Sequence, residues 1–326
     1  MRYLLNPHTD PYFNMAFDEY CLEHDIANEP FFYLWQNRPS VIIGANQQVH
    51  TEVNVPYLKA NNITLARRVT GGGAVYHDWG NLNYTIVGAT KEMESDYPEY
   101  ARMMQQALQQ LGVPATLSGR NDILVNGLKV SGFAKRVAKN RMMVHGTLMY
   151  DVDVEVLSQV LTPPAIKLEA KGIASVRSRV GNLKDFLPQF ADIHAFRSAL
   201  LRTLSGGCTE QLPCMSEKML AEIKQLAEQK FADWHWIYGH APQASLTQTA
   251  KLSCGTVTIH LRINKGLIEQ CCFEGDFLGN LPIAQLEDSL AGIAYERDAI
   301  ALQLAKHNIA AYLDGVTAED LLRVMI

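Results

Sequence analysis

The sequence predicts an α/β (α+β) protein with a large first domain and a small α+β second domain. Its 326 residues exceed the size at which a single hydrophobic core usually stops growing. Short β-prone runs alternate with amphipathic helical stretches over the first two thirds, and a polar stretch then precedes a separate hairpin followed by helices. We therefore expect domains at 1–240 and 250–326, joined by a linker at about 238–251.

Composition excludes several classes of protein. The chain is 48% hydrophobic and 19% charged, as ordinary globular proteins are. A net charge of −5 argues against a general nucleic-acid binder, and no apolar run approaches the ~20 residues that span a membrane. The segment from Met1 to Asp18 matches neither a signal peptide nor a transit peptide. The six scattered cysteines lack metal-binding spacing, so we expect reduced thiols, no structural metal site and a cytoplasmic protein.

The elements before residue 70 follow from local patterns. Phe13, Phe17 and Cys21 recur at helical spacing. Pro56 lies near the start of a short expected helix, where its missing N–H costs nothing. The expected elements are a helix over 13–24, strands over 31–35 and 41–43 paired as a hairpin, a helix over 54–60 and a strand over 63–66.

A glycine loop with charged flanks is the most distinctive segment of the chain. Arg67 and Arg68 precede Gly71-Gly72-Gly73, and a β-prone run then ends in His77-Asp78. Three glycines let backbone N–H groups approach a ligand closely, and the planar Arg68 guanidinium suits a carboxylate or phosphate. Another β-prone run follows at 82–87, so the loop joins strands and matches neither a dinucleotide-binding motif nor a P-loop. The alternative is a glycine-rich surface turn beside solvated arginines.

Lys129 lies one residue into the returning strand of a predicted hairpin. Asn126-Gly127 between apolar runs is the strongest short hairpin signal. Lys129 is either a solvated edge residue, which the pattern alone favours, or it points into a cleft toward anionic oxygen. His145, on a later strand, is likewise either structural or functional, and Gly146 beside it indicates a bulge or a close backbone approach.

The rest of the chain alternates helices and strands around one long polar segment. Residues 167–182 carry lysines and arginines among small residues, and this segment is either a functional lid or a flexible connector. The other expected elements are a helix over 100–111, a mobile basic turn with Lys135, Arg136, Lys139 and Arg141, a strand over 144–150, helices near 154–161, 193–204 and 216–231, strands near 257–263 and 267–273, and two or three final helices.

Four segments together resemble the signature segments of lipoate–protein ligase A. They are residues 67–78, 129–134, 145–148 and 171–180. The similarity runs from about Tyr12 to Pro188, and the tail after Tyr238 resembles the accessory C-terminal domain of two-domain members. The resemblance implies a large mixed-sheet catalytic domain of the biotin/lipoate ligase type. Thr70 replaces the more usual serine and Tyr76 a common phenylalanine, and either change could tune acyl-chain preference.

The resemblance implies an ATP-dependent lipoate–protein ligase that acts in two steps. (R)-Lipoate and ATP with Mg2+ first give lipoyl-AMP and pyrophosphate. The lipoyl group then passes to one lysine of a lipoyl domain, in an E2 subunit of a 2-oxo acid dehydrogenase complex or in glycine-cleavage H protein. We expect a monomer that binds no nucleic acid and no membrane.

The same comparison assigns roles to individual residues. Lys129 would be the catalytic residue, held between carboxyl and phosphate oxygens, where its charge stabilises the transferred group. Trp35, Val75 and Phe133 would help form an apolar tunnel. An adenylate-covering loop would act through Lys167, Lys171, Gly172, Ser175, Val176 and Arg177. The residues implied for the lipoate and adenylate pocket are Glu19, Trp35, Arg68, Thr70, Gly71, Gly72, Gly73, Ala74, Val75, His77, Asn81, Asn121, Asp122, Ser131, Gly132, Ala134, Arg136, His145, Gly146 and Thr147. No metal ligand is assigned, and Asp122 is the one candidate.

Two other functions stay open at this point. Octanoyltransferases share the fold and carry the acyl group on a cysteine, but no cysteine occurs between Cys21 and Cys208. The ligase is therefore favoured over a lipoyl or octanoyl transferase that uses a preformed acyl donor. A non-catalytic lipoate carrier is the second alternative, and an intact Lys129 and 167–182 segment argue against it. The C-terminal domain favours a ligase that needs no helper protein.

Overall fold

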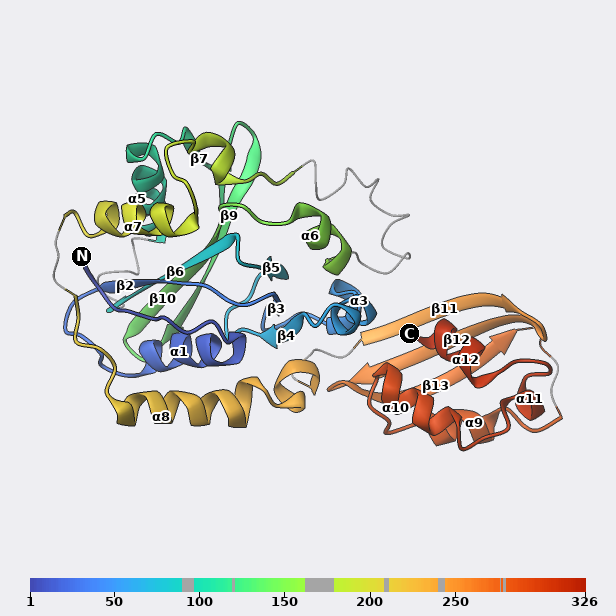
Figure 1. The fold of residues 1–326 in the computed structure, drawn as a ribbon. Coiled ribbons are helices and arrows are strands. Elements are labelled where there is room, and N and C mark those ends of the chain that lie inside the picture. The colour runs from blue at the N-terminus through green and yellow to red at the C-terminus, as the bar shows by residue number, and fades with distance from the viewer. Residues whose placement is uncertain are drawn as a thin grey trace. The chain divides into compact units, whose positions relative to one another are not determined.

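The computed structural model describes the chain except residues 90–96, 119–120, 162–178, 208–210, 240–243, 276 and 278–279. The chain divides into two compact units, Met1–Asp233 and Trp234–Ile326 (Figure 1). Both units combine helices with sheets, so the predicted α/β (α+β) class is confirmed. Among the described helices, none is long and apolar enough to cross a membrane.

Unit 1 is built on a seven-stranded mixed sheet. Its order is β1-β2-β6-β10-β9-β8-β7, with β1 parallel to β2 and every other neighbouring pair antiparallel. The strands are β1 (Arg2–Tyr3), β2 (Phe31–Trp35), β6 (Asn81–Ala89), β7 (Ala115–Ser118), β8 (Asp122–Val125), β9 (Leu128–Ala138) and β10 (Arg141–Met149).

A second sheet in unit 1 carries the glycine loop. β3 (Ser40–Ile43) runs parallel to β4 (Thr64–Arg67) and antiparallel to β5 (Val75–His77). The glycine loop connects β4 to β5, as predicted. The predicted hairpin between β2 and β3 is wrong, because β3 belongs to this second sheet. The connection is held by Asn14, whose amide donates to the Gln36 carbonyl and to Asn37 Oδ1.

Helices pack on both faces of the large sheet. Because side chains alternate along a strand, β6 directs Leu82 and Tyr84 into the apolar core with α5 (Tyr97–Gln110) and α7 (Ile193–Leu204). Thr85 points to the opposite face and donates to Asp18 of α1 (Pro11–Glu23). Figure 1 shows α1 on the side of the sheet away from α5 and α7. The shorter helices of unit 1 are α2 (Val49–Glu52), α3 (Val55–Ala60), α6 (Val154–Val160), the 3-10 helix at Leu183–Phe186, α8 (Glu217–Leu226) and the π-helical turn at Ala227–Phe231.

Two hairpins position the central strands. The predicted Asn126-Gly127 turn between β8 and β9 is confirmed, with φ of 50° and 82°. The predicted mobile basic turn after Lys135 is instead mostly strand, since β9 continues to Ala138 and pairs with β10 up to Arg141. Lys139, at φ 55°, lies in the short turn between them. Val137 and Ala138 continue the strand pattern between the basic residues, and the charges concealed it.

Unit 2 is a three-stranded antiparallel sheet covered by helices. Its strands are β11 (Ala244–Leu252), β12 (Gly255–Asn264) and β13 (Leu267–Gly275), in that order. The helices are a π-helical turn at His235–Gly239, α9 (Ala284–Leu290), α10 (Arg297–Leu304), α11 (Ile309–Tyr312) and α12 (Ala318–Met325). The predicted linker at 238–251 therefore contains most of β11. The exposed positions of this edge strand are polar, as at Ser245 and Thr247, which makes the strand look like a linker.

Candidate active site

A cavity in unit 1 gathers most of the residues singled out from the sequence. The empty space within it is about 600 Å³, including open solvent at its mouth. The large sheet, the glycine loop with β5, and α1 all contribute walls. The lining residues are Met15, Trp35, Ile42, Arg68, Gly72, Gly73, Ala74, Val75, His77, Asn83, Asn121, Lys129, Gly132, Phe133, Ala134, His145, Gly146 and Thr147.

Several expected residues do not line this cavity. They are Glu19, Thr70, Gly71, Asn81, Asp122, Ser131 and Arg136. The residues expected in the adenylate loop, Lys167, Lys171, Gly172, Ser175, Val176 and Arg177, lie outside the described residues. In the other direction, Met15, Ile42 and Asn83 line the cavity although sequence reasoning did not select them.

Arg68 holds the glycine loop together. Its side chain is 7% exposed and donates from Nη2 to the carbonyls of Gly71 and Gly73, at 2.7 and 2.8 Å. Nη1 donates to the Ile42 carbonyl and Nε to Thr70 Oγ1, both at 3.0 Å. Burial lowers the pKa of Arg68 to about 10, so it stays charged at neutral pH. Carbonyl and hydroxyl oxygens of the protein thus take four of its five N–H groups, which leaves no complete fork for an anion, and a role for Arg68 in lipoate or adenylate binding stays a prediction.

Arg67 and Gly44 fix the neighbouring loop against the glycine loop. Arg67 is fully buried and donates from Nη1 to the carbonyls of Gly44, Ala45 and Gln47. A Cβ on Gly44 would lie 2.2 Å from the carbonyl oxygen of Gly72, a distance that no side chain could tolerate. Only glycine permits this approach. The shape of the cavity wall therefore depends on the glycine loop and on the loop at residues 44–47 together.

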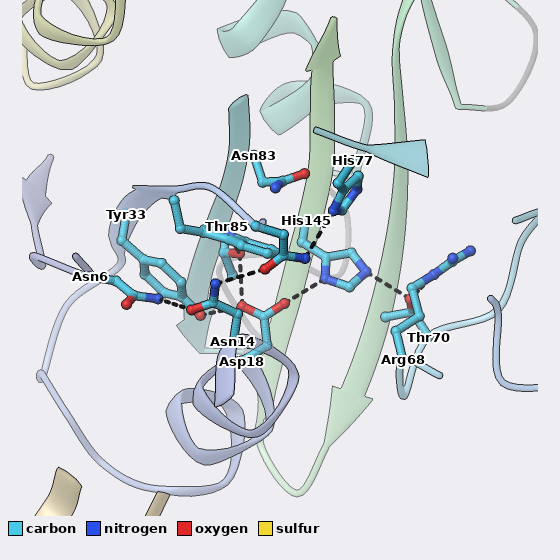
Figure 2. Close-up of polar contacts among 12 residues, drawn as sticks. Asn6, Asn14, Asp18, Tyr33, Arg68, Thr70, His77, Asn83, Thr85 and His145 are labelled. Atoms are coloured by element: carbon cyan, nitrogen blue, oxygen red, sulfur yellow. Dashed lines mark hydrogen bonds and ion pairs between the residues drawn. The ribbon is translucent and has the colours of Figure 1, made fainter. Parts of the chain in front are cut away.

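A buried hydrogen-bonded chain links α1 to the glycine loop through His145 (Figure 2). Asp18 Oδ2 lies 2.7 Å from His145 Nδ1, and His145 Nε2 lies 2.7 Å from Thr70 Oγ1. A carboxylate can only accept, so Nδ1 of His145 carries a proton. All three residues are buried. Thr70 thus touches the lining residues His145 and Arg68 without lining the cavity itself.

Asp18 is satisfied on its other oxygen as well. Tyr33 Oη and Thr85 Oγ1 both donate to Oδ1, at 2.6 and 3.0 Å, and Trp35 Nε1 donates to Thr85 Oγ1 at 2.9 Å. Burial, followed by the Asp18 charge, raises the pKa of Tyr33, which keeps its hydroxyl protonated as a donor. Sequence reasoning missed Asp18, Tyr33 and Thr85. These polar residues lie within otherwise apolar helices and strands, which is the pattern that could have identified them. Asp18 is one position before Glu19, the residue that the sequence analysis selected.

His77 is a neutral donor at the cavity wall. Asn14 donates to Asn37 Oδ1, so the amide nitrogen of Asn37 faces His77 Nδ1, at 3.0 Å, and donates to it. The ring proton of His77 is therefore on Nε2, which is buried and has no partner within the described part of the chain. Burial, followed by the charges of Arg68 and His145, lowers the pKa of His77 to about 3.

Lys129 lies at the mouth of the cavity beside Asp122. Its Nζ is 2.7 Å from Asp122 Oδ1, and the two side chains are 39% and 34% exposed. The Lys129 backbone accepts from Gly181 N and donates to the Arg179 carbonyl, so residues just after the 162–178 gap are tied to this lysine. A Cβ on Gly132 would lie 3.0 Å from Nζ, so glycine at this position leaves room for the ammonium group.

Glu19 and Arg136 are occupied elsewhere. Both Glu19 carboxylate oxygens lie 2.6 Å from Lys230 Nζ, which ties α1 to the π-helical turn at Ala227–Phe231. Arg136 donates to the Val69 carbonyl beside the glycine loop. Tyr76 is buried on β5 between the lining residues Val75 and His77 and points away from the cavity, so the expectation that it could tune chain preference loses its basis.

Neither a metal cluster nor a thiol is found at this site within the described residues. There, no group of three or more His, Cys, Asp or Glu side chains is placed to hold a metal ion. Asp122 Oδ1 pairs with Lys129. Cys21 is fully buried and does not line the cavity, and burial raises its pKa well above the usual range.

Family models match both units of the chain. Residues 10–205 match the lipoyl protein ligase A/B catalytic domain, and residues 241–325 match the bacterial lipoate protein ligase C-terminus. The chain is 39% identical to the lipoate-protein ligase LplJ of Bacillus subtilis, over 96% of each chain. It is 36% identical to lipoate–protein ligase 1 of Staphylococcus aureus, over 100% of each.

Solved structures of the same kind are also similar. A bi-partite lipoate protein ligase from Thermoplasma acidophilum, studied with its E2 lipoyl domain, is 31% identical with a TM-score of 0.66, over 73% of this chain and 96% of that one. A structure of protein Ta0514 from T. acidophilum with bound lipoic acid is 28% identical with a TM-score of 0.62, over 73% of this chain and 98% of that one. A lipoate-protein ligase A bound with ATP is 29% identical with a TM-score of 0.63, over the same shares.

Proposed function

The chain belongs to the lipoyl protein ligase A/B family, and we propose that its unit 1 cavity activates lipoate with ATP and delivers it to a protein lysine. The activity is that of an ATP-dependent lipoate–protein ligase, in line with its relatives and with the lipoic acid and ATP held by similar structures. The residue roles below are our assignments.

One observation carries the assignment of the site. A single cavity joins a largely apolar interior, with Met15, Ile42 and Val75 in its walls, to an ammonium group at its mouth, that of Lys129. An acyl chain needs the apolar interior, and a carboxylate meeting a phosphate needs the cation. The two parts lie within the reach of one small carboxylic acid.

In the first step a lipoate carboxylate oxygen attacks the α-phosphorus of ATP. A bond forms between that oxygen and phosphorus, the bond to the bridging oxygen of the β-phosphate breaks, and pyrophosphate leaves. Lys129 would bring the two anions together and stabilise negative charge on the α-phosphoryl oxygens. Its ion pair with Asp122 holds the ammonium group at the cavity mouth before substrate binds.

In the second step an acceptor lysine amine attacks the acyl carbon. The amide bond forms, the bond to the phosphate oxygen breaks, and AMP leaves. We propose that the acceptor is a lipoyl domain, because the similar T. acidophilum ligase was studied with its E2 lipoyl domain. The E2 subunits of 2-oxo acid dehydrogenase complexes and glycine-cleavage H protein are the expected classes. Segment 162–178 lies between α6 and the residues tied to Lys129, which supports a role for it near the adenylate.

Mg2+ would be held mainly by the nucleotide. The described residues offer no cluster of metal-binding side chains, and Asp122, the candidate ligand, already pairs with Lys129. Magnesium commonly keeps several waters and binds substrate phosphates with few protein ligands. This donor set does not fit a site built from protein ligands alone, and the steps above use only Lys129 and the cavity.

The experiment that tests this function uses the purified chain with lipoate, ATP and Mg2+ and a lipoyl-domain acceptor. Mass spectrometry of the acceptor and a pyrophosphate assay are run together. A lipoyl mass gain that requires ATP, with stoichiometric pyrophosphate, is the expected result. A gain only from synthetic lipoyl-AMP would instead mean a transferase, and binding of lipoate without any modification would mean a carrier.

A further inference from the structure

The cavity contains two buried donors that the protein leaves unused. Among the residues that the structure describes, His77 Nε2 and Asn83 Nδ2 have no hydrogen-bond partner, and both residues line the cavity at no more than 3% exposure. An unpaired buried donor costs about 1–3 kcal/mol, so two in one cavity indicate a ligand atom that accepts from them.

The neighbouring hydrogen bonds determine which atoms of His77 and Asn83 face the cavity as donors. Asn83 Oδ1 accepts from Asn81 Nδ2 at 2.9 Å, which leaves the amide nitrogen of Asn83 to the cavity. The Asn14–Asn37 chain places the His77 proton on Nε2. The other nitrogen-bearing side chains that line the interior are engaged, since Arg68, His145 and Trp35 all bond within the protein. Both side chains line the same cavity, and both are labelled in Figure 2.

Strand register places Asn83 at the end of the cavity far from Lys129, and the His77 ring lies near Trp35, the cross-strand partner of Asn83. Gly132, beside the Lys129 ammonium group, donates from its backbone N–H to Thr147 Oγ1 at 3.3 Å. Thr147 of β10 is directly opposite Asn83 of β6, and Asn83 is opposite Trp35 of β2. Two strand spacings of about 4.8 Å separate Gly132 from Asn83, which is about 10 Å. That span is close to the length of an extended octanoyl chain.

We infer that His77 Nε2–H and Asn83 Nδ2–H face the dithiolane sulfurs and select lipoate over a purely aliphatic acid of the same length. This inference rests on the proposed function, because it places the lipoate carboxylate at Lys129. Sulfur is a weak acceptor, but a terminal methyl or methylene accepts nothing and leaves both donors unpaired. The His77 ring lies 6.1 Å from that of Trp35, so the same end offers an aromatic wall to a polarisable ring.

The test compares three acids by calorimetric titration without ATP. They are lipoate, octanoate and cyclopentylpentanoate, the carbocyclic analogue in which CH2 groups replace both sulfurs. Wild-type protein should bind lipoate about tenfold more tightly than cyclopentylpentanoate, since the rings match in shape and differ only in acceptors. Asn83→Leu should bring this ratio close to one by weakening lipoate and strengthening the analogue. Thr147→Val, one strand closer to Lys129 in the same row, should shift all three affinities by one factor.

Three results would overturn the inference. Equal affinity of the wild type for lipoate and its carbocyclic analogue would mean that the donors do not contact sulfur. If Asn83→Leu bound all three acids more weakly by the same factor, the donors would contact the carboxylate, which all three acids share, and not the ring. Binding of no acid by the wild type would instead refute the proposed function, and the inference with it. If leucine disrupts the fold, Asn83→Ser, which withdraws the amide, is expected to reduce the same ratio.

Discussion

His145 on β10 and Asp18 on α1 are joined by a hydrogen bond of 2.7 Å between Nδ1 and Oδ2, although 127 positions separate them in the chain. Both side chains are buried, and the far nitrogen of the same ring meets Thr70 Oγ1 at 2.7 Å. Through Thr70 and Arg68, this contact connects helix α1 to the glycine loop that lines the cavity. The glycine loop, which forms one wall of the cavity, is therefore held in position by contacts that extend to helix α1.

Asp18→Asn should weaken lipoate binding more than it slows turnover. An amide would point its NH2 at one of three donors, Tyr33, Thr85 or His145, so at least one hydrogen bond is lost. We expect a loss of about 1–3 kcal/mol in the free energy of unfolding and a KM for lipoate raised about tenfold or more. Nitrogen NMR of the His145 ring, which reports the tautomer, together with the KM and kcat measurements checks this.

Asp25→Asn is the matched control for that substitution. Asp25 also accepts a hydrogen bond, from Arg141 at 3.0 Å, but its side chain is 91% exposed. Because the Asp25 carboxylate is solvated and the buried Arg141 also donates to the His24 carbonyl, we expect this substitution to cost at most about 1 kcal/mol. If Asp18→Asn left the tautomer and the KM as unchanged as this control does, the positioning role of Asp18 would be wrong.

Lys129→Ala should abolish pyrophosphate release while leaving thermal unfolding nearly unchanged. The Lys129 side chain is 39% exposed and pairs with a similarly exposed Asp122, so its loss costs the fold little. Lys184→Ala provides the comparison, because Lys184 forms an ion pair of similar exposure with Asp151 away from this cavity. A pyrophosphate rate in Lys129→Ala within a fewfold of that of Lys184→Ala would refute the catalytic assignment.

The depressed pKa of His77 predicts a pH dependence of stability. Its pKa is about 3 in the folded protein and near 6.5 when unfolded, so the unfolded state binds a proton first as pH falls. The contribution of His77 to the free energy of unfolding is complete above pH 6.5 and is lost progressively as pH falls toward 3. Urea unfolding of the wild type and of His77→Gln between pH 4.5 and 7.5 measures it. The wild type should lose up to about 1.4 kcal/mol per pH unit more than the variant, and parallel curves would contradict the shift.

Much of this architecture was predictable because local chemistry decides it. The Asn126-Gly127 turn forms because both positions need positive φ, and α7 begins and ends where its apolar stripe does. The glycine loop could be recognised by composition, and its placement between strands by the β-prone runs on either side. The residues of the cavity wall then follow largely from strand alternation.

The errors come from contacts between distant segments. No local pattern shows that β3 pairs with β4 and β5 and not with β2, since that choice depends on Asn14 holding the connection. Arg68 looked like an anion site because its carbonyl partners are assembled only by the fold. Asp18 and Glu19 are adjacent carboxylates on one helix, and the sequence does not say which of them faces β10.

The substitution Glu19→Gln tests whether Glu19 and Asp18 have different roles. Consecutive helical residues point about 100° apart, so Asp18 faces the sheet while Glu19 faces Lys230. The Glu19 carboxylate is 6% exposed and loses a charge-assisted pair, so we expect a decrease of about 2 kcal/mol in the free energy of unfolding. The KM for lipoate should stay at the wild-type value, whereas Asp18→Asn raises it. The KM is measured at a temperature well below the unfolding transition of the variant. A KM for lipoate above the wild-type value would mean that Glu19 contributes to lipoate binding, and it would contradict the different roles assigned to Asp18 and Glu19.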